Sequence, residues 1–108
     1  MTRAQLARAL ELMDVNLSRS PSLEEIAGAA GLSPAHFIRQ FKASMGMAPH
    51  RYLLRSRMER AKRLLRETDR SVAQIAFACG FSHQQHMTRV FGRFTGTTPA
   101  AFRRAARS

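Results

Sequence analysis

The sequence predicts an all-α fold made of two copies of one helical unit with a long helix between them. Three observations support this fold class. Apolar residues recur at helical spacing along the chain of 108 residues, no stretch shows the alternation of a half-buried strand, and one segment is repeated 49 residues later. A hydrophobic content of 44% is normal for a globular protein.

The first copy begins with an amphipathic helix that we expect to end near Ser20-Pro21. Its apolar stripe has the spacing i, i+4, i+7 and i+11 and consists of Leu6, Leu10, Met13 and Leu17. Ser22 and Glu25 then have the spacing of a capping box, which predicts a second, short helix. The apolar stripe expected for this helix is Leu23, Ile26, Ala27 and Ala30.

Glycines and prolines predict the bounds of the next two helices. Gly31 is expected to end the second helix in a left-handed turn, and Ser33-Pro34 to open a third helix. That helix is expected to end at Gly46, and Pro49 opens a longer helix over about Pro49–Arg66. The apolar side of the long helix consists of Leu54, Met58, Ala61 and Leu65, and many arginines lie opposite.

The segment after the long helix repeats the first one. At an offset of 49, Ser71, Ile75, Ala76, Cys79, Gly80, Phe81 and Ser82 match Ser22, Ile26, Ala27, Ala30, Gly31, Leu32 and Ser33. After one inserted residue the offset is 50, and Met87, Arg89, Phe91, Gly96, Pro99 and Phe102 match Phe37, Arg39, Phe41, Gly46, Pro49 and Tyr52. We therefore divide the chain into residues 1–48, a linker helix 49–66, and residues 67–108.

Two short helices joined by a glycine turn are typical of a helix-turn-helix unit, whose second helix lies in the DNA major groove. The expected second helices span about 34–44 and 83–94 and contain no acidic residue. On a helical wheel, Gln85 and Arg89 lie opposite the apolar face of the later helix, and Ala35, Arg39 and Lys42 lie opposite that of the earlier one. These outward faces favour base reading over a plain solvated surface.

The charge points to a polyanionic partner. The net charge is +11, and residues 49–108 hold thirteen basic and three acidic side chains.

The opening MTRAQLARALELM lacks the apolar core of an export signal, and Cys79 is the only cysteine, so we expect a cytoplasmic, nucleoid-associated protein. Cys79, His83 and His86 match no common zinc spacing, and no catalytic carboxylate pair or phosphate loop occurs, so we expect no metal, no cofactor and no enzyme activity.

The stretch RSVAQIAFACGFSHQQHMTRVFGRFTGTTPAAFRR and the linker segment RMERAKRLL resemble the DNA-binding domain of AraC/XylS-type bacterial transcription regulators, over about Gln5 to Arg104. The resemblance implies seven helices, two helix-turn-helix subdomains (a homeodomain-like duplicate) and a rigid linker helix. It implies a domain that binds double-stranded DNA as a monomer, in adjacent major grooves, and regulates transcription. RNA polymerase is a second candidate partner, and any sensing or dimerisation domain would lie outside this chain.

The resemblance carries the base-reading role to Ala35, Ile38, Arg39, Gln84, Gln85, His86 and Arg89. Ala35 and Ile38 are apolar where many relatives have longer or polar readers. We therefore expect the first unit either to touch thymine methyl groups or mainly to position the protein, with Arg39 as its one strong polar reader. The candidates for phosphate contact are Ser33, Lys42, Arg51, Arg55, Ser82, Arg93 and Arg103, the two serines because they are expected at helix N-termini. We interpret Arg57, Arg60 and Arg63 as a solvated face or as partners of Glu59 or Glu67.

Two alternatives remain from the sequence. The first is an architectural or recombination-associated DNA-binding module that regulates no promoter. The second is a basic helical module that binds a membrane surface or a partner protein through the amphipathic helix Pro49–Arg66. The apolar stripe of that helix is better explained as packing within the fold, so we expect no membrane contact.

Overall fold

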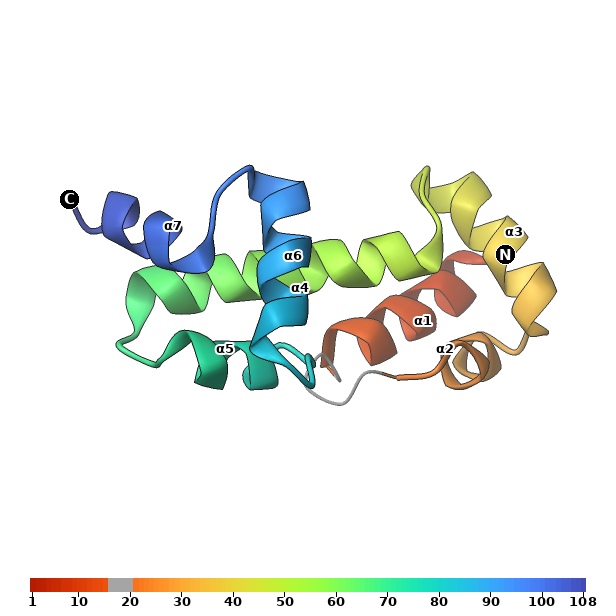
Figure 1. Cartoon of the computed structure of the whole chain (residues 1–108). Coiled ribbons are helices and arrows are strands. Elements are labelled where there is room, and N and C mark those ends of the chain that lie inside the picture. Colours follow the sequence, from red (N-terminus) through yellow and green to blue (C-terminus); the bar gives the residue numbers. More distant parts are fainter. Residues whose placement is uncertain (16–20) are drawn as a thin grey trace. The chain divides into compact units, whose positions relative to one another are not determined.

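The computed structural model describes residues 1–15 and 21–108, and these residues form seven α-helices and no strand (Figure 1). The helices are α1 (Arg3–Val15), α2 (Leu23–Ala29), α3 (Pro34–Met45), α4 (Pro49–Glu67), α5 (Val72–Ala78), α6 (Gln84–Thr95) and α7 (Pro99–Ala106). The expected all-α fold, with two helix-turn-helix units and a long linker helix, is confirmed. Leu17 and the expected end of α1 at Ser20 lie outside the described residues. Among the described helices, none combines the length and apolar character that crossing a bilayer requires.

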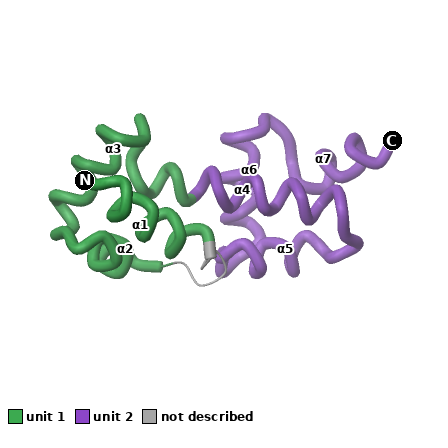
Figure 2. The backbone as a smooth tube through the Cα atoms, turned by 180° about the vertical axis from the view of Figure 1, so that it is seen from behind, with its two compact units in different colours: residues 1–53 green, residues 54–108 purple. Residues whose placement is uncertain are grey.

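The chain divides into two compact units, residues 1–53 and residues 54–108, with the boundary inside α4 (Figure 2). Each unit has its own hydrophobic core. Among the described residues, the buried members of the core of unit 1 are Ala9, Met13, Ile26, Ala27, Ala30, Phe37, Phe41 and Leu53. The ring of Phe41 lies 5.4 Å from that of Phe37 and meets Tyr52 edge-on at 5.6 Å, between ring centroids.

Unit 2 repeats this packing. The buried residues of its hydrophobic core are Met58, Ala61, Leu65, Ile75, Ala76, Cys79, Phe81, Met87, Val90 and Phe91. Phe91 meets Phe102 edge-on at 5.5 Å, which reproduces the contact between Phe41 and Tyr52 at the offset of 50 that the sequence predicts. The aromatic edge-to-face pair therefore holds α3 against the start of α4 in unit 1, and α6 against α7 in unit 2.

The turns of the two helix-turn-helix units use the same hydrogen bonds. Ser22 and Ser71 each begin a short helix with a complete capping box. The helices end at Gly31 (φ 71°) and Gly80 (φ 87°), where a left-handed backbone suits glycine. The amide of the following residue donates to a carbonyl five residues back, Leu32 to Ala27 and Phe81 to Ala76, each at 3.0 Å. This Schellman pattern sets the direction in which α3 and α6 leave the turn.

Candidate nucleic-acid interface

The helix α6 has an apolar inner face and a polar outer face. Met87, Val90 and Phe91 are buried in the core of unit 2. The predicted base readers on this helix are all exposed, namely Gln84, Gln85, His86 and Arg89. Long hydrogen-bonding side chains therefore point away from the core, and no carboxylate of α6 lies among them to repel phosphate.

The helix α3 has the same arrangement with smaller side chains. Phe37 and Phe41 are fully buried, whereas Ala35, Arg39 and Lys42 are exposed. Ile38, the third predicted reader of this helix, is 38% exposed and so presents part of its apolar surface to solvent. Arg39 is the one predicted reader of α3 with strong hydrogen-bond donors.

The N-termini of the two reading helices differ. Ser33 begins α3 as expected, and its hydroxyl accepts a hydrogen bond from the His36 amide at 3.3 Å. The expectation that Ser82 begins α6 is wrong, because the N-cap is His83, whose side chain makes no capping hydrogen bond. The residue inserted into the second copy lies before the helix, so α6 starts one residue later than the offset of 49 indicates. Ser82 is exposed in the turn.

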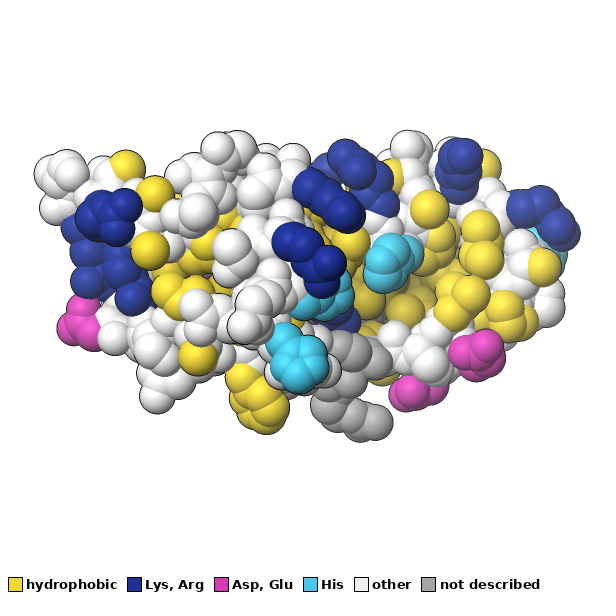
Figure 3. Space-filling view, in the orientation of Figure 1, with side chains coloured by type: hydrophobic (Ala, Val, Ile, Leu, Met, Phe, Trp, Pro, Cys, Tyr) yellow, Lys and Arg dark blue, Asp and Glu magenta, His cyan; other side chains and the backbone are white. Residues whose placement is uncertain are grey.

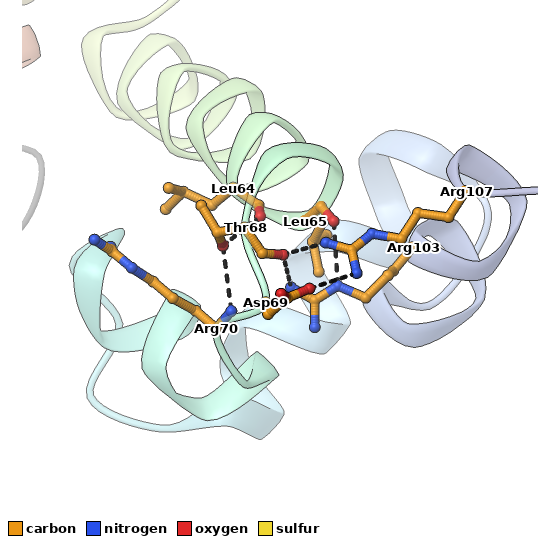
Figure 4. Close-up of polar contacts among 7 residues, drawn as sticks. All are labelled: Leu64, Leu65, Thr68, Asp69, Arg70, Arg103 and Arg107. Atoms are coloured by element: carbon orange, nitrogen blue, oxygen red, sulfur yellow. Dashed lines mark hydrogen bonds and ion pairs between the residues drawn. The ribbon is translucent and has the colours of Figure 1, made fainter.

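The predicted phosphate contacts fall into two groups. Lys42, Arg51, Arg55 and Arg93 are exposed, and their contacts with DNA stay predictions. Arg103 is partly buried and already has intramolecular partners: its Nε donates to the carbonyl of Leu65 and an Nη to that of Thr68, both at 3.1 Å (Figure 4).

Arg103 and Arg107 together form an arginine clamp. Arg107 donates to the Thr68 carbonyl and to the Asp69 carboxylate, the latter at 2.8 Å (Figure 4). The carbonyls of Leu65 and Thr68 lie at the C-terminal end of α4, where a helix has unsatisfied acceptors and a partial negative charge. Arg103 and Arg107 therefore hold α7 against the end of α4.

The interpretation of Arg57 as part of a solvated face is wrong. Its side chain is 6% exposed, and its guanidinium lies over the Phe81 ring, 5.5 Å from the centroid. Burial lowers the pKa of Arg57 from its ordinary value. Glu59 pairs with Lys62, at 2.7 Å, rather than with an arginine. Position 57 lies three residues after Leu54 and four before Ala61, so the side chain borders the apolar stripe of α4.

Basic side chains gather in unit 2. On the face that Figure 3 shows, they lie beside α6 and near the end of α7.

Cys79 takes the apolar place that Ala30 has in unit 1, and burial raises the pKa of its thiol to about 11. Within residues 1–15 and 21–108, no group of three or more His, Cys, Asp and Glu side chains is placed to hold a metal ion.

Two N-caps were not predicted from the sequence, although it contains the residue patterns that indicate them. Ser71 and Gln74 form a capping box, with both bonds present at 2.9 and 3.1 Å. Thr98 begins α7 by accepting a hydrogen bond from the Ala101 amide, directly before Pro99 at the first helical position. The first follows the S/T-x-x-E/Q pattern that predicted the equivalent helix of the first copy, and the second follows the cap-plus-proline pattern that Ser33-Pro34 shows before α3.

Comparison with known proteins places these features in a family. Residues 26–105 match a family described as a helix-turn-helix domain. The transcriptional activator RhaS of Escherichia fergusonii is 37% identical over 102 residues, which is 94% of this chain and 37% of the relative. The chain spans about a third of the length of the curated relatives it matches.

Solved structures agree in fold over almost the whole chain. An AraC-type transcriptional regulator from Chromobacterium violaceum superposes with a TM-score of 0.87 at 34% identity, covering 94% of this chain and 91% of that one. The DNA-binding domain of the global transcriptional factor AdpA, in complex with a target DNA, superposes with a TM-score of 0.91 at 34% identity, covering 95% and 93%. The duplicated turn, the two outward-facing helices and these matches together show that the chain belongs to the AraC/XylS family of transcription regulators and corresponds to its helix-turn-helix DNA-binding domain.

Proposed function

We propose that this chain binds double-stranded DNA in a sequence-specific manner and thereby regulates transcription, with α3 and α6 lying in adjacent major grooves. One observation carries this proposal: the second helix of each helix-turn-helix unit has an exposed face without acidic residues, with an arginine, Arg39 or Arg89, at the equivalent position. The DNA complex of the similar AdpA domain supports it. An arginine on the outer face of a recognition helix has the reach and geometry to bind base edges.

The exposed side chains suit different bases. Arg39 and Arg89 can each donate two hydrogen bonds to guanine O6 and N7, and Gln84 or Gln85 can pair with adenine N6 and N7. Ala35 and Ile38 suit the thymine methyl group. Each good bidentate pair contributes about 1–3 kcal/mol of discrimination. Unit 2, with four polar readers, is therefore expected to contribute most of the specificity, and unit 1 to rely on Arg39.

Phosphate contacts would set the register of the protein on the duplex. We assign them to Lys42, Arg51, Arg55 and Arg93, and to the backbone amides at the start of α3 beside Ser33. Ser82, which precedes α6, and Arg103, which has donors beyond the two it uses in the clamp, are the weaker members of this set.

The proposal extends to partners and organisation. Two reading helices in one chain allow a monomer to occupy two half-sites, with residues 1–48 and 67–108 as the reading segments and 49–66 as the linker. Relatives named as activators support RNA polymerase as a second partner. Binding to chromosomal DNA would place the protein at the nucleoid in the cytoplasm, and no catalytic role is assigned.

Selection from a random pool of DNA duplexes with the purified chain tests this function. We expect an asymmetric site of two half-sites whose centres lie about one helical turn, ~10 bp, apart. Bound sequences without a consensus would contradict the proposal and would favour an architectural DNA-binding module.

A further inference from the structure

Arg57 is the one buried charged side chain that the described residues contain, with 6% of its surface exposed. A guanidinium removed from water is costly unless other groups compensate for its lost hydration. Part of that compensation comes from the face of Phe81, 5.5 Å away, since an aromatic face attracts a cation. Phe81 is itself buried, at 3% exposed, in the turn between α5 and α6.

Phe81 also touches a predicted base reader. The ring of His86, in the first turn of α6, meets it at a centroid distance of 5.1 Å and an interplanar angle of 87°. An edge-to-face contact of this kind restricts the orientation of the imidazole. A continuous series of contacts therefore runs from Arg57, in the middle of α4, through Phe81 in the turn to His86 on the exposed face of α6. All three residues belong to unit 2.

In the described part of unit 1, the positions equivalent to Phe81 and His86 form no such ring contact. Leu32 occupies the place of Phe81 and His36 that of His86, so the aromatic contact is missing there. The first turn of α3 is instead capped by the hydroxyl of Ser33, whereas His83 makes no side-chain cap at α6. The ring contact is therefore a feature by which unit 2 differs from unit 1 at the start of its reading helix.

We infer that Arg57 and Phe81 are positioning residues that orient His86 for base reading. The inference rests on the proposed function, since His86 reads a base only if α6 lies in a major groove. It assigns a specificity role to two buried side chains, Arg57 and Phe81, that do not themselves reach the DNA. Fixing the imidazole before binding means that less side-chain freedom is lost when it meets a base edge.

Base discrimination by Arg57→Met and Phe81→Leu, each against wild type, tests the inference. The first removes the charge, and the second copies the residue found in unit 1. Arg66→Met is the matched control, because the Arg66 guanidinium lies over a different ring, that of Phe102, 6.0 Å from the centroid. The base pair read by His86 is identified first, as the position at which His86→Ala loses discrimination on the selected site.

We expect Arg57→Met and Phe81→Leu to reduce discrimination at that base pair about 2- to 10-fold, with smaller changes at the other positions. In both variants, the NMR chemical shifts of the His86 ring protons, measured without DNA, should differ from those of the wild type. Arg57→Lys, which keeps a cation, should recover most of the discrimination, and Arg66→Met should leave both readouts unchanged.

The inference is overturned if the wild type discriminates but both variants keep the His86 ring shifts and discriminate within twofold of wild type. Equal weakening at every base pair, or no loss from His86→Ala, also overturns it. A wild type that binds all sequences alike refutes the proposed function instead. In that case the His86 ring shifts of Arg57→Met, which keeps the Phe81 ring, still decide whether Arg57 and Phe81 orient His86.

Discussion

At the scale of single residues, similar basic side chains have different tasks. Arg93 is exposed on α6, whereas Arg103 donates two hydrogen bonds to carbonyls at the end of α4 and Arg57 is buried against Phe81. Composition counts all three equally toward the charge of +11. Their partners decide which of them stabilises the fold and which is available to phosphate.

Arg103→Ala is expected to destabilise the protein, because it leaves the carbonyls of Leu65 and Thr68 without these donors. The loss in the free energy of unfolding should be about 1–3 kcal/mol, as for hydrogen bonds from a charged group. Arg93→Ala, the control, should change stability by less than about 0.5 kcal/mol and weaken DNA binding. Urea unfolding of both variants measures this, and equal stabilities would contradict the structural role of Arg103.

Cys79 makes the stability depend on alkaline pH. Burial raises the thiol pKa from 9.0 to about 11, and the nearby arginines oppose this shift. The folded state therefore holds the proton more tightly, so this contribution is complete below pH 9 and is lost as the pH rises toward 11. Between pH 8 and 10.5 the wild type should lose about 2 kcal/mol more than Cys79→Ala, which copies Ala30 of unit 1. Parallel unfolding profiles for the two proteins would refute this.

At the scale of the elements, each short helix depends on its first turn. Ser71 accepts from the Gln74 amide at 3.1 Å while the Gln74 side chain accepts from the Ser71 amide at 2.9 Å. Ser71→Ala should lower the free energy of unfolding by about 0.5–2 kcal/mol, a typical cost of losing an N-cap. Ser82→Ala is the control and should have little effect, since Ser82 does not cap α6. Thermal unfolding distinguishes the two, and an equal loss would place a cap at Ser82 after all.

The elements also show what a sequence reveals. Ser22 with Glu25, Gly31, and Ser33-Pro34 are local signals, so the bounds of α2 and α3 were predictable. The start of α6 was not, because a one-residue insertion between Ser82 and Met87 can lie on either side of the cap. The outward direction of the readers followed from helical spacing, since Met87 and Phe91 had to face the core.

The burial of Arg57 needed tertiary information. A position beside the apolar stripe of α4 is compatible with a buried guanidinium. It is equally compatible with an arginine whose aliphatic stem packs on the stripe while the guanidinium reaches solvent. Only the placement of Phe81 in the turn after α5 shows where the guanidinium lies. The clamp of Arg103 and Arg107 is likewise a contact between residues more than 30 positions apart, which no local pattern indicates.

For the whole molecule, charge predicts a strong dependence of DNA binding on salt. Residues 49–108 carry thirteen basic and three acidic side chains. If six to ten phosphates are contacted, affinity should fall by about 10³–10⁵ between 50 and 200 mM salt because counterions are released on binding. Titration of labelled duplex at several salt concentrations measures the slope. Arg55→Ala should reduce the slope by about one, and a slope near zero would exclude phosphate as the main source of affinity.

The central claim is that both helix-turn-helix units read bases. Selection from random DNA, repeated with Arg39→Ala and with Arg89→Ala, tests it most directly. Each variant should lose preference at one or two base pairs of its own half-site, at a cost of about 1–3 kcal/mol per contact, and keep the preferences of the other half-site. Uniform weakening over all sequences, or the same lost positions in both variants, would contradict it.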